Sequence, residues 1–158
     1  MHDPKPHDDL LHGERLLIRT VRLLALATPC HSLRAHFEAA CGCSGEEAYR
    51  MLEAFVQQLG ARGRRRVTLS IPADPRLTDD EVLILDAFGC AQAEDYRSLD
   101  ERLTGLVGAP PPFPLGAAAC VVAETLAMNG LMLRARPAPD SLIPRAWRDD
   151  PPFLMAAE

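Results

Sequence analysis

Cysteine and histidine residues gather between positions 30 and 43, where five of them fall within fourteen residues. Thiolates and imidazoles are the ligands that zinc prefers, they also suit iron, and a Cys-x-Cys pair can chelate one ion. A metal-binding or redox protein, with zinc or iron as its cofactor, is therefore one hypothesis. Its ligands would be Cys30, His31, His36, Cys41 and Cys43.

The same residues also have a purely structural explanation. Zinc sites commonly combine two closely spaced Cys pairs, and this stretch lacks that arrangement. At about 100° per residue, a helix would place Cys41 on the opposite flank from His36 and Cys43. A cysteine without a metal behaves as a small hydrophobic residue. We therefore expect no cofactor and keep metal binding as an alternative.

Charged residues inside apolar stretches form a second group of candidates. Glu124 lies in the middle of 115–133, which holds only two other polar side chains, and Asp86 lies in a similar setting. A carboxylate buried in such a helix needs a cationic partner or loses its charge. We expect a structural ion pair, with a functional acid in a pocket as the alternative. The expected partners are three arginines at spacings of four and three: Arg15, Arg19 and Arg22.

Residues 33–59 resemble a bacterial helix-turn-helix motif, with Gly42 at the turn and Ala48 and Met51 at inward positions. Two features oppose this interpretation. The motif usually has Ala where this chain has Glu38, and the presumed reading helix carries three glutamates that phosphates would repel. A DNA-binding regulator spanning 33–66 is thus an alternative rather than the main expectation. The arginines that would contact DNA are Arg50, Arg62, Arg64, Arg65 and Arg66.

The composition limits the function classes. Hydrophobic residues make up 47% and charged residues 25% of the 158 residues, which is ordinary for one globular domain. The net charge of −5 argues against general affinity for nucleic acid or an anionic membrane. No phosphate loop, nucleotide fingerprint or nucleophile elbow is present, so an enzyme is not indicated. The Ala, Arg and Pro bias suggests a GC-rich bacterial genome, and the N-terminus shows no signal-peptide pattern, which predicts a cytoplasmic protein.

The stretch 115–133 is the longest apolar segment, and prolines and arginines bound it. Its length approaches the ~20 residues of a membrane span, but the central Glu124 opposes that interpretation. A stripe of small residues on it predicts a closely packed neighbour. We therefore expect a buried helix, either in the core or at an oligomer interface.

Other helices should surround this segment. Apolar periodicity predicts helices over 10–28, 33–41, 45–59 and 94–107. Capping-box patterns begin at Ser44 and Thr78, and the second predicts a further helix to about 92. Residues 67–71 alternate apolar and polar side chains, which is typical of an extended strand.

Together these patterns predict an all-α fold, a bundle of five or six helices around 115–133 with a short extended segment near 67–71. We expect a flexible arm at 1–9, one helical domain at 10–134 and a Pro-rich tail or strap at 135–158. Two nearly all-apolar helices in so small a chain favour self-association. The predicted function is that of a small bacterial protein acting through protein contacts as a homodimer.

Overall fold

The helix over Asp79–Gln92 (α4) begins at the predicted capping box. The Thr78 hydroxyl accepts a hydrogen bond from the Glu81 amide at 3.0 Å, and the Glu81 carboxylate accepts one from the Thr78 amide at 2.9 Å. These two bonds satisfy amides that have no partner within the helix. From Leu83 to Ala91, every side chain of α4 is buried. This helix therefore forms the most enclosed part of the core.

The computed structural model describes residues 10–26, 31–62 and 64–134, and this part of the chain is all-α, as predicted. Six α-helices and one short 3₁₀ helix are assigned there, and no β-strand. Besides α4 they are α1 (His12–Ala25), α2 (His31–Ala40), the 3₁₀ helix η2 (Gly42–Ser44), α3 (Gly45–Arg62), α5 (Tyr96–Val107) and α6 (Phe113–Met128).

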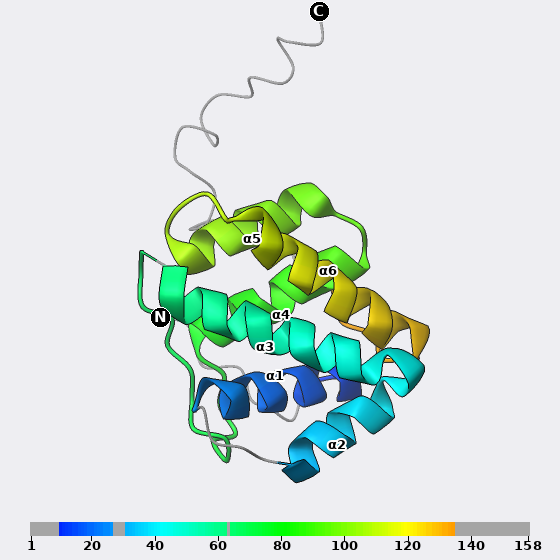
Figure 1. Cartoon of the computed structure of the whole chain (residues 1–158). Helices are drawn as coiled ribbons and strands as arrows, with labels where there is room; N and C mark the ends of the chain where they lie inside the picture. Colours follow the sequence, from blue (N-terminus) through cyan, green and yellow to red (C-terminus); the bar gives the residue numbers. More distant parts are fainter. Residues whose placement is uncertain (1–9, 27–30, 63, 135–158) are drawn as a thin grey trace, which may run out of the picture.

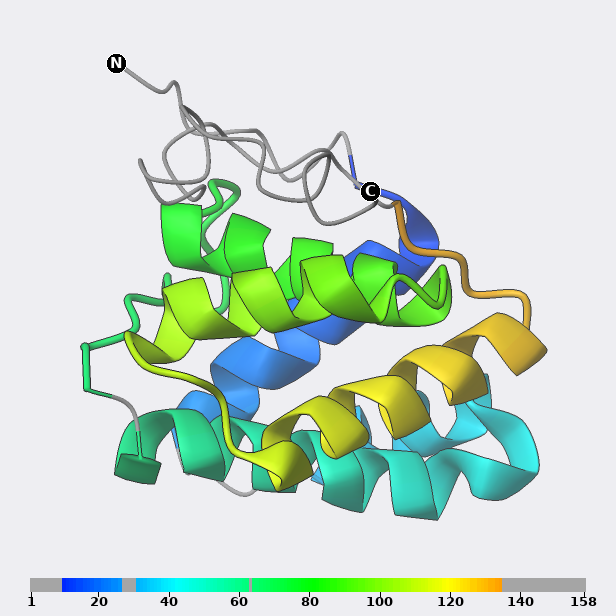
Figure 2. The same cartoon turned by 90° about the horizontal axis from the view of Figure 1, so that it is seen from above.

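Four of the helices pack as two antiparallel pairs. α4 and α5 run in opposite directions and contact each other, and α3 and α6 do the same (Figures 1 and 2). α6 also packs on α4, which joins the two pairs, while α1 and α2 contact α3. The ring of Phe55 on α3 meets that of Phe88 on α4 edge to face, with 4.8 Å between their centroids. The core therefore lies between α3, α4 and α6.

Among the helix ends that differ from the sequence-based prediction, two lie at turns. The helix expected over 115–133 ends at Met128, because Gly130 adopts a positive φ of 75° and the Asn129 side chain donates to the Thr125 and Cys41 carbonyls. The capping box expected at Ser44 does not form, since Ser44 is the last residue of η2, which leads directly into α3. Both differences arise from backbone geometry at a turn, which side-chain patterns do not specify.

Residues 66–71 form no helix or strand and instead attach to the start of α4. The Thr68 amide donates to Asp80 at 2.7 Å, and the Thr68 carbonyl accepts from the Thr78 hydroxyl at 2.7 Å. These bonds satisfy backbone groups of Thr68 that a neighbouring strand would otherwise satisfy, so the extended segment needs no strand partner there.

The predicted arm at 1–9 and tail at 135–158 lie outside the described residues. Among the helices that are described, none combines the length and the hydrophobicity that a membrane crossing requires.

Candidate functional site

The cysteine and histidine candidates are not brought together in the described part of the chain. His31 and His36 are exposed on α2, Cys43 is exposed in η2, and Cys41 is buried. Burial raises the pKa of the Cys41 thiol to about 11, which disfavours the thiolate that a metal would bind. No three His, Cys, Asp or Glu residues in the described ranges could hold a metal ion together. Cys30 lies outside those ranges.

The buried-charge candidates divide into two groups. Arg22 and Asp86 are each 1% exposed, whereas Arg15 and Arg19 are exposed on α1. Glu124 is exposed as well, so the expectation of a buried carboxylate in 115–133 was wrong. The reason is that α6 buries one face against α3, α4 and α5 and turns the face that carries Glu124 to the outside.

Arg22 forms the most connected polar centre of the described chain. Its guanidinium pairs with Glu81, whose side chain is fully buried, and it donates to the carbonyls of Asp74 at 2.8 Å and Arg76 at 2.7 Å. A planar guanidinium matches such a set of acceptors in fixed directions. Arg22 thereby joins the end of α1 to the start of α4 and to the loop between 72 and 76. This arrangement is structural, because its donors and acceptors are occupied by the protein itself.

The spacing of the arginines indicates Arg22 as a candidate, but no sequence pattern indicates its partner. Glu81 stands out in the sequence only as part of a capping box, and the two residues lie 59 positions apart. Glu14 was also missed: it is fully buried and pairs with Arg134 at 2.9 Å. Glu14 and Glu81 each lie at the third position of a helix. A glutamate at this position predicts a capping interaction, but it does not predict pairing with a distant arginine.

The described nucleic-acid candidates differ in whether a carboxylate lies beside them. Arg50 lies 3.7 Å from Glu46 on the same helix, and Arg65 is paired with Asp80 at 2.6 Å. Arg64 and Arg66 are exposed, and the side chain of Arg62 is outside the described part. The exposed glutamates of α3 remain beside Arg50, so the geometry does not favour the DNA-binding alternative.

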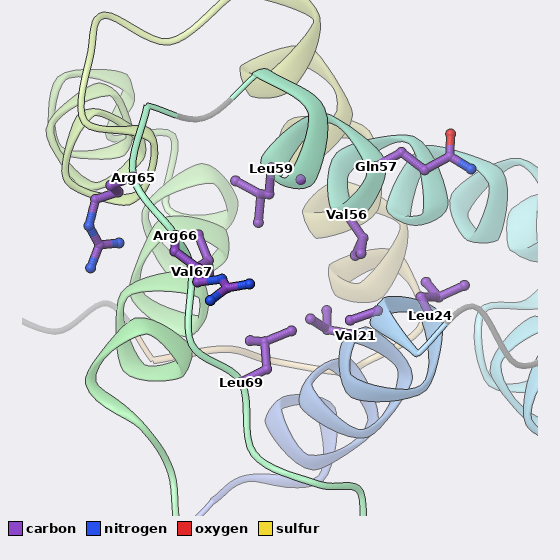
Figure 3. Close-up of a pocket in the computed structure, with 11 residues that line it drawn as sticks. Val21, Leu24, Val56, Gln57, Leu59, Arg65, Arg66, Val67 and Leu69 are labelled. Carbon is purple, nitrogen blue, oxygen red and sulfur yellow. The ribbon is translucent and has the colours of Figure 1, made fainter.

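A cavity of about 430 Å³ opens between α1, α3 and the segment 65–69 (Figure 3). Its walls are mainly aliphatic, and two arginines lie at one side. In Figure 3 the Arg66 side chain is directed into the space between Leu59, Val21 and Leu69, while Arg65 turns away from it. We call this the α1–α3 cavity. Its lining includes six aliphatic side chains and the inward-directed arginine: Val21, Leu24, Val56, Leu59, Val67, Leu69 and Arg66.

The outward surface of α6 is unusually apolar for a helix face in water. Phe113 is 87% and Met128 75% exposed, and the residues between them on that side are small or aliphatic except for Glu124. At about 100° per residue, six side chains fall within an arc of about 100°. We call them the α6 face: Phe113, Ala117, Cys120, Val121, Glu124 and Met128.

A shallow groove of about 280 Å³ lies beside one end of the α6 face. Its lining includes the exposed ring of Tyr96, the prolines Pro111 and Pro112, and Phe113 and Cys120 from α6. The groove and the α6 face form one continuous, mostly apolar surface.

Comparison with known proteins gave no match: no family model, no curated protein and no solved structure matches the chain.

Proposed function

We propose that this protein acts through protein contacts and forms a homodimer in which the α6 faces of two copies pack together. The observation that carries the proposal is the exposure of the α6 face. Single exposed apolar side chains are ordinary, but a continuous row that extends into a groove is typical of an interaction site. The helix bears one charge on this face, Glu124.

A two-fold arrangement suits the order of residues along the face. Two α6 helices crossing in opposite directions near Cys120 would place Phe113 of one copy against Met128 of the other. Ala117 would then lie opposite Glu124, where its small side chain leaves room for the longer one. Each contact occurs twice, as an isologous interface requires. Contacts between methionine sulfur and aromatic rings are favourable, and the flexible Met side chain adapts to irregular spaces.

The groove beside Phe113 supplies a concave partner for this contact. Met128 projects from the far end of the same helix and is largely exposed. In the two-fold arrangement, Met128 of each copy would enter the groove of the other, between Tyr96 and the Pro111–Pro112 pair. An exposed knob and a groove on one surface make the surface self-complementary.

Sedimentation velocity at micromolar concentrations tests the proposal. The unmodified chain should sediment as a dimer. Phe113→Asp should weaken the dimer at least about tenfold, since buried aromatic residues contribute strongly to interfaces and 1.4 kcal/mol corresponds to a factor of ten. The matched control is Ile71→Asp, which adds the same charge at a 68% exposed position away from α6. A compact monomer for the unmodified chain would overturn the proposal, and so would an equal loss in both variants.

A further inference from the structure

The α1–α3 cavity is separate from the α6 face and has the features of a small-molecule site. Binding cavities are concave, mainly apolar and equipped with a few polar groups that fix the orientation of the ligand. Here Val21 and Leu24 come from α1, Val56 and Leu59 from α3, and Val67 and Leu69 from the segment that crosses the opening. Three elements thus contribute aliphatic walls to one space.

The charge at the cavity has one sign. Among the eleven described residues that line it, none is acidic and two are arginines. Arg65 is held by Asp80 at 2.6 Å and donates to the Leu106 carbonyl at 3.2 Å, so its guanidinium is engaged outside the cavity. Arg66 is directed inward (Figure 3) and forms no hydrogen bond or ion pair with another described residue. Within its described lining, the cavity therefore combines an aliphatic interior with an available cation, Arg66.

The size of the cavity suits a small ligand. Its volume of about 430 Å³ lies within the range of about 300–1,000 Å³ that is typical of small-molecule sites. A saturated carboxylate with about ten carbons belongs to this class of ligand. Its chain would contact the aliphatic walls, and its carboxylate would accept paired hydrogen bonds from the Arg66 fork. We propose that the α1–α3 cavity binds a medium-chain aliphatic carboxylate, with Arg66 as the group that recognises the charge.

Isothermal titration of the full chain with decanoate, below its micelle concentration, tests this proposal. Decanoate should bind with a saturable stoichiometry of one per chain. Decanol, which keeps the chain but lacks the charge, and acetate, which keeps the charge but lacks the chain, should each bind at least about tenfold more weakly. Equal binding of decanol would overturn the assignment of charge recognition.

Variants locate the site. Arg66→Gln should weaken decanoate at least about tenfold while leaving the circular dichroism spectrum and the dimer unchanged. Leu24→Trp, which places a larger side chain at the half-buried wall of α1, should also weaken it. Arg50→Gln removes an exposed arginine elsewhere and should have no effect. The proposal fails if decanoate does not bind, or if Arg66→Gln and Arg50→Gln bind it equally.

Discussion

Arg22 is the side chain on which the junction of α1, α4 and the 72–76 loop depends. Its side chain is 1% exposed, and that of its partner Glu81 is fully buried. Removing one partner of a buried ion pair leaves an uncompensated charge, which costs about 3–5 kcal/mol. Arg22→Met should therefore lower the free energy of unfolding by about that amount in urea denaturation. Arg19→Met, one turn earlier and exposed, should change it by less than about 0.5 kcal/mol. Equal effects of the two variants would contradict the structural role of Arg22.

The cysteines should differ in reactivity because burial differs among them. A thiol whose pKa lies at about 11 carries about 0.1% thiolate at pH 8, and the thiolate is the reactive form. Iodoacetamide at pH 8 should therefore label the exposed Cys43 well before the buried Cys41. Because the Cys41 pKa is raised, its labelling should accelerate about tenfold per pH unit up to that pKa. Peptide mass spectrometry over a time course gives the rates, and comparable rates at pH 8 would contradict the burial of Cys41.

Two glycines of α3 offer a matched test of how this helix is placed. A Cβ on Gly45 would lie 2.3 Å from the Glu38 carbonyl oxygen, whereas a Cβ on Gly60 would meet nothing within 4 Å. Gly45→Ala should thus destabilise the protein by about 1–3 kcal/mol, because backbone must move. Gly60→Ala should stabilise it by about 0.5–1 kcal/mol, since alanine favours a helix. Thermal unfolding of both variants gives the signs. Two stabilising substitutions would mean that α2 and α3 are not in close contact at Gly45.

The helices themselves were largely predictable from local patterns. The Thr78 capping box and the apolar periodicity of 45–59 correspond to the observed starts of α4 and α3. Local patterns were less informative at turns: Gly130 ends α6 five residues before the predicted end at 133. The end of a helix also depends on contacts with distant elements. The Asn129 side chain donates a hydrogen bond to the carbonyl oxygen of Cys41, 88 positions away.

At the level of the whole molecule, the all-α fold was predicted and the polar contacts between distant residues were not. Apolar composition alone made 115–133 look buried on all sides, yet Glu124 is exposed because α6 has neighbours on one side only. From the sequence, Arg66 is a candidate for DNA contact and not for a cavity, because a run of arginines does not reveal that its side chains point in different directions. Both candidate sites therefore depend on helix packing, which periodicity does not determine.

Glu124, the exposed carboxylate of the α6 face, should oppose formation of the proposed dimer. Packing two α6 faces together would remove Glu124 of both copies from water, at a cost that an uncharged side chain avoids. Glu124→Gln should therefore tighten the dimer by about tenfold or more, measured by sedimentation equilibrium. Glu53→Gln, which removes an exposed charge from α3, should leave the dimerisation constant nearly unchanged. A weaker dimer in Glu124→Gln would exclude the α6 face as the interface.

Chemical cross-linking at Cys120 tests the proposed interface most directly, because it reports both the association and the face involved. Packed helices lie about 8–10 Å apart, so two Cys120 thiols near a two-fold axis are within reach of a short bis-maleimide. In a chain with Cys30→Ser and Cys43→Ser, we expect covalent dimers that depend on Cys120 and that Phe113→Asp largely abolishes. Dimers in sedimentation that do not cross-link through Cys120, or cross-links that persist in Phe113→Asp, would exclude the α6 face as the dimer interface.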